Sequence, residues 1–173
     1  IRHNRADGGG WPACGLGGGI FCDRAARIEN NMILGNRAAS AGGGLAFSGA
    51  DGTRLVNNTI TRNEDWSGCG DGVYCYDSDL EIWNGIFWDN ESGNGEAFYC
   101  ESYSNISIEN SDLDGGLSEV WLDSTSTFTM GQGMIDADPL FAPGESDGHL
   151  TYDSPCKNSG NGNAPGLPPI DFE

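Results

Sequence analysis

Short runs in which apolar and polar residues alternate recur along this chain at a fixed interval. One eleven-residue stretch occurs three times and is followed by a weaker copy: ARIENNMILGN (26–36), TRLVNNTITRN (53–63), LEIWNGIFWDN (80–90) and ISIENSDLDGG (106–116). Equivalent apolar positions in the first three copies are 27 residues apart. A period between about 20 and 50 residues is typical of solenoid proteins, in which successive repeats stack on one another.

A second alternating run precedes each copy. It reads GGGIFC (17–22), GGGLAF (42–47), GDGVYC (70–75) and GEAFYC (95–100). Alternation at period two predicts strands, and the Gly, Asn, Asp and Ser residues between the runs predict turns. Because no window shows helical periodicity, the helical repeat classes are excluded. The sequence therefore predicts an all-β solenoid with two short strands in each repeat.

The alternation also predicts which side chains form the interior. Two columns of the first run suit a core: Ile20, Leu45, Val73 and Phe98, and Cys22, Phe47, Cys75 and Cys100. The column between them suits an exterior aromatic stack: Phe21, Ala46, Tyr74 and Tyr99. In the second run the predicted inward residues are Ile28, Leu55, Ile82 and Ile108, with Arg27, Arg54, Glu81 and Ser107 pointing outward.

Asparagines recur at two structural positions. The first column contains Asn30, Asn57, Asn84 and Asn110, and the second contains Asn36, Asn63 and Asn90. Stacked strands lie about 4.8 Å apart, which allows one amide to donate to the next. Asparagine also tolerates left-handed turns. We therefore predict inward asparagine ladders at the corners, with ordinary Asn-rich loops as the alternative.

The repeats divide the chain into three parts. Residues 1–16 form a Gly-rich lead-in or partial coil, and residues 17–136 form about five coils, the last of them degenerate. Five of the seven prolines lie beyond residue 140. We therefore expect residues 137–173 to form an irregular C-terminal cap and tail. The start within repeat-like sequence, without an initiator Met or signal peptide, indicates a processed or truncated product.

The charge of the chain limits its partners. Eight basic residues against 26 acidic ones give a formal net charge of −18. Such a surface disfavours nucleic acid and anionic membranes, and no apolar run approaches the length of a membrane span. The expected partners are further copies of the chain or a cell-surface glycan, with no nucleic acid and no membrane insertion.

The repeat motifs resemble those of bacterial secreted right-handed parallel β-helix proteins and of polymorphic outer-membrane proteins. The most specific similarity is to the C-terminal end-piece of these proteins, and it lies in DADPLF (136–141), GHL (148–150) and SPC (154–156). Together the similar segments cover most of residues 17–160. The resemblance implies a right-handed parallel β-helix in an extracellular or cell-surface location. It implies no activity, because the family is functionally mixed.

The cysteines also favour export. The six are Cys14, Cys22, Cys69, Cys75, Cys100 and Cys156, and none forms the C-x-x-C pair of a zinc site. An even number of cysteines in an acidic chain is typical of exported proteins, in which disulfides persist. Cys14 and Cys69 both precede the first run of their coils and are a candidate disulfide. For Cys75 and Cys100 the alternatives are a bridge and buried thiols.

Acidic pairs are candidates for catalysis and for calcium binding. The pairs Asp77/Asp79 and Asp112/Asp114 have a spacing at which two carboxylates share a face, as in glycoside hydrolases. Solvated turns explain them better, and His3 and His149 lie outside the repeats, so no residue is predicted to be catalytic. Calcium is the one candidate cofactor, with hard oxygen ligands also offered by Asp65/Asp71, Asp136/Asp138 and Glu145/Asp147.

These observations favour an exported, non-enzymatic structural or adhesive module that assembles end to end into extracellular fibres. Assembly is expected because the ends of a solenoid expose unpaired strands. The alternative is a domain that binds or cleaves polysaccharide, in which exposed aromatic residues stack on sugars. The candidate aromatic residues are Trp11, Trp66, Tyr74, Trp83, Trp88 and Tyr99. A third hypothesis is a stalk or passenger fragment of a larger surface protein.

Overall fold

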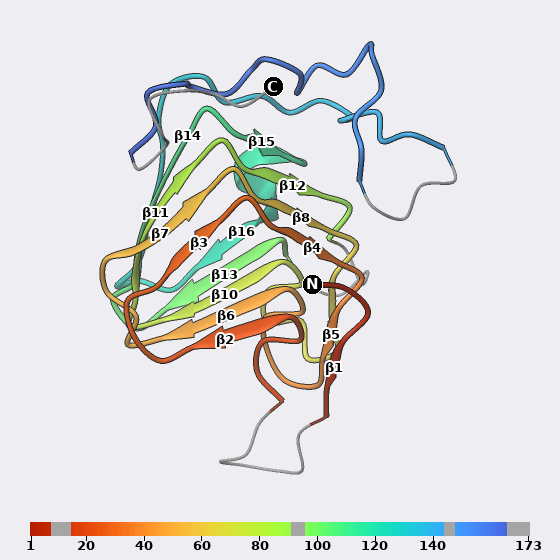
Figure 1. The fold of residues 1–173 in the computed structure, drawn as a ribbon. Coiled ribbons are helices and arrows are strands. Elements are labelled where there is room, and N and C mark those ends of the chain that lie inside the picture. Colours follow the sequence, from red (N-terminus) through yellow and green to blue (C-terminus); the bar gives the residue numbers. More distant parts are fainter. Residues whose placement is uncertain (8–14, 91–95, 144–147, 166–173) are drawn as a thin grey trace.

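The computed structural model describes residues 1–7, 15–90, 96–143 and 148–165. Its strands wind into a parallel β-solenoid with four sheets, shown in Figure 1. Every pairing between named strands is parallel, and each strand pairs with its counterpart in the neighbouring coil. Within the described residues the helical content is one short 3-10 helix, η1 (Gly116–Glu119). The all-β solenoid predicted from the repeats is therefore confirmed.

Each sheet collects one strand from each coil. The first sheet contains β2 (Ile20–Cys22), β6 (Leu45–Ser48), β10 (Val73–Tyr76), β13 (Phe98–Glu101) and β16 (Val120–Leu122). The second contains β3 (Arg27–Glu29), β7 (Thr53–Val56), β11 (Asp79–Trp83), β14 (Asn105–Glu109) and β17 (Thr127–Met130). The third contains β4 (Met32–Leu34), β8 (Thr59–Thr61), β12 (Ile86–Trp88) and β15 (Asp112–Leu113). The fourth contains β1 (Arg5–Ala6), β5 (Arg37–Ala38) and β9 (Glu64–Asp65).

The coils differ from the prediction in their number and in the strands that each coil contains. Two sheets have five strands, but the third has four and the fourth three, so about three coils are complete rather than five. The predicted second run contains two strands, because Asn30 has a left-handed φ of 56° that separates β3 from β4. A further strand, β5 or β9, follows in the first two coils.

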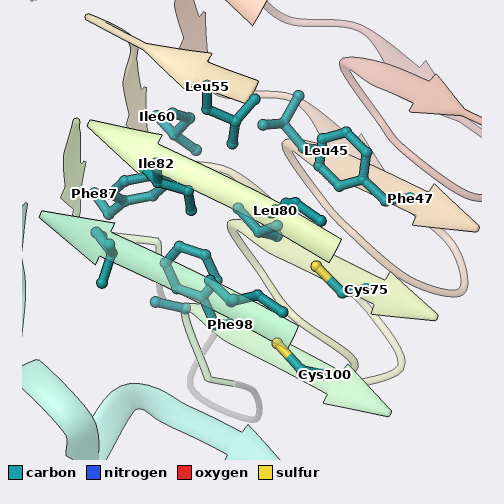
Figure 2. Close-up of a cluster of buried hydrophobic side chains, with 14 of the residues drawn as sticks. Leu45, Phe47, Leu55, Ile60, Cys75, Leu80, Ile82, Phe87, Phe98 and Cys100 are labelled. Carbon is teal, nitrogen blue, oxygen red and sulfur yellow. The ribbon is translucent and has the colours of Figure 1, made fainter. Parts of the chain in front are cut away.

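The core lies between the sheets and consists of the columns predicted from the alternation. Leu45, Val73 and Phe98 are Cα partners in adjacent strands and are fully buried. Figure 2 shows these columns meeting the aliphatic side chains of the second and third sheets. The rings of Phe87 and Phe98 pack with centroids 4.8 Å apart. Each large core side chain stabilises the fold by roughly 1.5–3 kcal/mol.

The glycine triplets allow neighbouring coils to approach closely. A Cβ at Gly43 would lie 2.4 Å from the Asp71 carbonyl oxygen in the next coil. A Cβ at Gly44 would lie 3.1 Å from the Asn63 amide. Glycine at these positions therefore provides the space in which the buried Asn63 side chain is held.

The C-terminal segment packs along the side of the solenoid. Gly148 lies against the Met32 side chain of β4, and the Cys156 thiol donates to Asp112 Oδ2 of β15 at 3.0 Å. Because β4 and β15 are the outer strands of the third sheet, the segment crosses that sheet from one edge to the other. Figure 1 shows it in blue beside the coils. The irregular segment expected after residue 136 thus covers a side of the solenoid.

Candidate functional site

A buried asparagine ladder runs along one corner of the solenoid. The Nδ2 group of Asn36 donates to Asn63 Oδ1 at 3.0 Å, and that of Asn63 donates to Asn90 Oδ1 at 3.0 Å. Asn63 Nδ2 also donates to the Ile33 carbonyl at 2.9 Å. All three side chains are at most 2% exposed. The ladder satisfies backbone groups inside the corners, where water cannot reach them.

The second asparagine column stacks in the same way but on the outside. Asn57 donates to Asn30 at 3.1 Å and Asn84 donates to Asn57 at 2.9 Å, and all three have left-handed φ angles. These side chains are half-buried or exposed. The column from Asn30 to Asn110 was expected to point inward, so its observed orientation differs from the prediction. The inward amides at this corner belong to the next residues, of which Asn31 is half-buried and Asn58 is buried. A left-handed residue turns the chain, so its successor points inward.

The aromatic column lies on the outer face of the first sheet. The rings of Tyr99 and Trp121 stack with centroids 4.0 Å apart and an angle of 11° between their planes. Tyr74 lies on the other side of Tyr99, at 6.1 Å. Its hydroxyl donates to Glu101 Oε1 at 2.6 Å, and burial together with this hydrogen bond raises the pKa of Tyr74 well above its ordinary value.

Ring stacking along the solenoid axis limits what this column can bind. Both faces of Tyr99 point at other rings, whereas a sugar stacks only on a free aromatic face. The remaining candidate aromatics lie on other sheets: Trp83 on β11, Trp88 on β12 and Trp66 next to β9. Trp11 lies outside the described residues. The aromatic residues therefore do not form one sugar-binding platform in the described part of the chain.

Three of the four acidic residues considered as candidates for hydrolysis accept hydrogen bonds within the fold. Asp79 Oδ1 accepts from Asn105 Nδ2 at 2.7 Å, and Asp77 occupies a left-handed turn. Asp112 is buried beneath the C-terminal segment, whereas Asp114 accepts from the Asp89 amide at 3.1 Å. Neither pair presents two exposed carboxylates on one strand face.

The calcium candidates also bond to the backbone. Asp136 accepts from the Gly115 amide, and Asp138 accepts from the Leu140 amide. Asp65 and Asp71 are fully buried, and Asp71 Oδ1 accepts from the Asp65 amide at 2.6 Å. Glu145 and Asp147 lie outside the described residues, among which no group of three or more potential metal-binding side chains occurs. A calcium site stays a prediction.

The described cysteines carry free thiols: Cys22, Cys69, Cys75, Cys100 and Cys156. Cys75 and Cys100 are adjacent in the core, where burial raises the pKa of Cys75 well above its ordinary value. Cys14 lies outside the described residues, so its pairing with Cys69 stays a prediction. Burial raises the pKa of Cys69 as well.

An arginine-lined hollow occurs where the third and fourth sheets meet. Its volume is about 550 Å³, and three consecutive coils supply its lining. The charged and polar side chains lining it are those of His3, Asn4, Arg5, Arg37, Arg62 and Glu64. The sequence patterns did not single out this site. A usable signal was present, because seven of the eight basic residues occur in the first 62 residues.

Comparison with known families identifies the fold family. Residues 2–132 match the family described as right handed beta helix region. The chain belongs to the right-handed β-helix family. Among the curated proteins and the solved structures compared with it, none matches. A right-handed β-helix supports a structural or polysaccharide-associated module in general. No helix in the described residues has the length and apolarity needed to cross a membrane.

In the last coil of the β-helix, the inward-facing residues are partly exposed, whereas their equivalents in the preceding coil are buried. Leu122, Phe128 and Met130 continue the inward columns of Cys100, Ile106 and Ile108. The earlier three are at most 1% exposed, whereas Leu122 is 37% exposed and the other two are half-buried. Ile20 and Cys22 in the first coil are half-buried too. The described β-helix therefore has an apolar layer at each end.

Proposed function

We propose that this β-helix is an exported structural module whose copies join end to end. The observation that supports it is the partial exposure of Leu122, Phe128 and Met130 in the last coil. Burial of apolar surface stabilises the contact by about 25 cal/mol per Å². The outer strands β16 and β17 would gain backbone hydrogen bonds from a second copy placed there.

The first coil of a second copy provides suitable strands for this contact. Strands β2 and β3 are the outer strands at the opposite edges of the same two sheets. Placing β2 on β16 and β3 on β17 continues both parallel sheets without changing direction. The contact is heterologous, so repeated addition produces a fibre rather than a closed dimer.

Net charge opposes this association. Two copies that each carry −18 repel one another at low ionic strength. Salt screens that repulsion, but it leaves apolar burial and backbone hydrogen bonds largely intact. Assembly should therefore increase as the salt concentration rises.

Sedimentation velocity and electron microscopy test the proposal. We expect monomers at about 0.02 M NaCl and end-to-end oligomers or fibres at about 0.5 M NaCl. Leu122→Gln should reduce assembly because it places an amide in the apolar contact. Leu117→Gln is the matched control, since Leu117 is 59% exposed but lies in η1, outside the inward columns. Monomers at both salt concentrations, or equal effects of the two substitutions, would contradict the proposal.

A further inference from the structure

A further cavity lies between the third sheet and the C-terminal segment. Its volume is about 540 Å³, which is within the range of small-ligand pockets. The third sheet supplies Trp88 and the residues that follow β8 and β12, and the C-terminal segment supplies the rest of the lining. The cavity is therefore formed by the packing of this segment on the sheet.

Apolar side chains form part of the lining: Trp88, Leu140 and Phe141. Trp88 and Phe141 are half-buried, and Leu140 is 39% exposed. Leu140 has a left-handed φ of 51°, a conformation that is unfavourable for a residue with a side chain. Its amide donates to Asp138 Oδ1 at 2.8 Å and its carbonyl accepts from the Thr151 amide at 2.9 Å, so two hydrogen bonds hold it in place. Strained residues of this kind cluster at functional sites.

The charged part of the lining has an excess of carboxylates. Its charged residues are Arg62, Asp89, Asp138 and Asp153. Arg62 pairs with Asp89 at 3.4 Å, so these two charges compensate each other. Within the part of the chain that the structure describes, Asp138 and Asp153 make no ion pair, and both are exposed. The cavity therefore presents two carboxylates whose charge is not compensated.

The surroundings of the cavity reinforce this negative charge. Residues 66–173 contain 20 acidic residues and one basic residue, Lys157. The Lys157 ammonium lies 4.1 Å from the Tyr152 ring centroid. Charges within a Debye length, about 10 Å at 0.1 M salt, act on a ligand in the cavity. The cavity should consequently attract cations and repel anions.

A buried hydroxyl lies on the same face of the third sheet. Thr61 is 1% exposed, and its Oγ1 has no hydrogen-bond partner among the described residues. Thr61 is the Cα partner of Trp88, and paired residues of neighbouring strands point to the same face of a sheet. The Thr61 side chain is therefore directed to the face that carries the cavity. Since buried polar groups nearly always have a partner, this oxygen is available to a donor from a ligand.

We propose that this cavity binds the alkylammonium group of an aliphatic amine, as carried by lysine side chains and by polyamines. An ammonium group has three N–H donors and no acceptor. Asp138, Asp153 and the Thr61 hydroxyl provide acceptors, and the hydrogen bonds to the carboxylates are charge-assisted. The aliphatic stem packs on Trp88 and Leu140. The Trp88 ring also attracts a cation placed over its face.

The lining favours this ligand over other classes. Calcium takes six to eight oxygen ligands, and among the described residues no group of three or more potential metal-binding side chains occurs. An inorganic cation also gains nothing from the apolar wall. A neutral ligand would leave the two carboxylates uncompensated. The inference is independent of end-to-end assembly, because the cavity lies on a side of the solenoid.

Isothermal titration calorimetry at about 0.02 M NaCl tests the proposal. The probes are Nα-acetyl-lysine methylamide, the same compound with its ε-amine acetylated, and methylammonium. We expect the lysine derivative to bind about tenfold more tightly than methylammonium, because its stem buries apolar surface. It should also bind more tightly than the uncharged ε-acetylated compound, and its affinity should fall with salt, opposite to the salt dependence of assembly.

Two ligands of equal charge identify the source of the amine. Spermidine is a free polyamine, and an acetylated and amidated trilysine peptide carries the same number of ammonium groups on side chains. The tighter of the two shows which source the cavity prefers.

A matched pair of variants separates the cavity from the overall charge. Asp153→Asn should weaken binding of the lysine derivative about tenfold, as loss of a charged hydrogen-bond acceptor does. Asp51→Asn is the control, because Asp51 is an exposed aspartate in the turn between β6 and β7 and the substitution changes the net charge equally. The control should leave the affinity nearly unchanged.

Two further variants separate binding from folding. Leu140→Gly removes part of the apolar wall and relieves the left-handed strain, so it should weaken binding severalfold without lowering the unfolding midpoint. Thr61→Val removes the hydroxyl but keeps the shape of the side chain, and it should act in the same way because Oγ1 has no partner in the fold.

Three results would overturn the proposal. The first is a lysine derivative that binds no better than methylammonium or the ε-acetylated compound. The second is an equal loss of affinity in Asp51→Asn and Asp153→Asn. The third is unchanged affinity in both Leu140→Gly and Thr61→Val.

Discussion

At the scale of single residues, side-chain amides replace the water that corner backbone groups would otherwise bind. Asn63 illustrates this role. Its Oδ1 accepts from the Asn36 amide and side chain, and its Nδ2 donates to Asn90 and to the Ile33 carbonyl. One residue thus connects three successive coils. Such fully satisfied networks stabilise a fold, but loss of one member leaves several buried groups without partners.

Replacing Asn63 should therefore destabilise the fold. We expect Asn63→Ala to lower the free energy of unfolding by about 4 kcal/mol, since about four hydrogen bonds worth about 1 kcal/mol each are lost. Asn57→Gly is the control because it removes an amide of the outer, half-buried ladder yet keeps a residue suited to the left-handed turn, and it should cost under about 1 kcal/mol. Urea denaturation measures both. Equal losses would show that the buried ladder has no special role.

At the scale of elements, the repeating strands and an irregular C-terminal segment were predictable, whereas the contacts that attach this segment were not. Alternation places Val73, Cys75 and Phe98 correctly in the core, because each coil repeats the same environment. A corner at Asn30 was expected, but the separate strand that follows it, β4, was missed, because only two strands per repeat were predicted. The arginine hollow was missed because its residues come from coils with different local sequences.

The C-terminal segment depends on contacts that occur once. The hydrogen bond from Cys156 to Asp112 joins residues 44 positions apart and belongs to no repeat. Burial raises the pKa of Asp112, and burial with this hydrogen bond raises the pKa of Cys156 to about 12. A pattern search finds columns of equivalent residues, so it cannot find a single buried thiol–carboxylate pair.

This pair should make attachment of the C-terminal segment sensitive to alkaline pH. An unfolded thiol titrates near pH 8.5, whereas the native Cys156 keeps its proton until about pH 12. The associated stability is therefore present below about pH 8.5 and lost as the pH rises toward 12. Between pH 9 and 10 the loss is about 1 kcal/mol, so proteolysis of the segment should accelerate about fivefold.

Cys156→Ser provides the comparison, because a serine hydroxyl does not titrate in this range. Limited proteolysis followed by mass spectrometry locates cleavage after residue 136. The variant should show little change between pH 9 and 10 once the pH dependence of the protease itself is subtracted. The same acceleration in both proteins would exclude Cys156 as its source.

At the scale of the whole molecule, charge is distributed unevenly along the solenoid axis. The lead-in and the first two coils contain all seven arginines, and cross-coil ion pairs such as Arg54–Glu81 and Arg62–Asp89 lie at the boundary between this part and the acidic coils. Beyond it the coils are uniformly acidic, so their carboxylates repel one another. The last coil also has the least buried inward residues. Stability should consequently decrease toward that end.

Hydrogen exchange followed by mass spectrometry tests this gradient. Amides of β7, β8 and β11 should be the most protected, and those of β16 and β17 the least, because local opening follows burial. Raising NaCl to about 0.5 M should protect β14, β16 and β17 more than β3 and β7, since salt screens the acidic coils. Salt and protein concentration are varied separately, which distinguishes screening from assembly. Uniform protection along the chain would contradict the gradient.

The stacking of parallel strands has a mechanical consequence. Hydrogen bonds between coils point along the solenoid axis, whereas the covalent backbone runs around it. Force applied between the two ends would therefore load a few such bonds at a time and peel the coils away one after another. Each released coil adds roughly 27 residues of unfolded chain, which span about 90 Å when fully extended. The molecule would yield in steps under tension and lengthen greatly before it breaks.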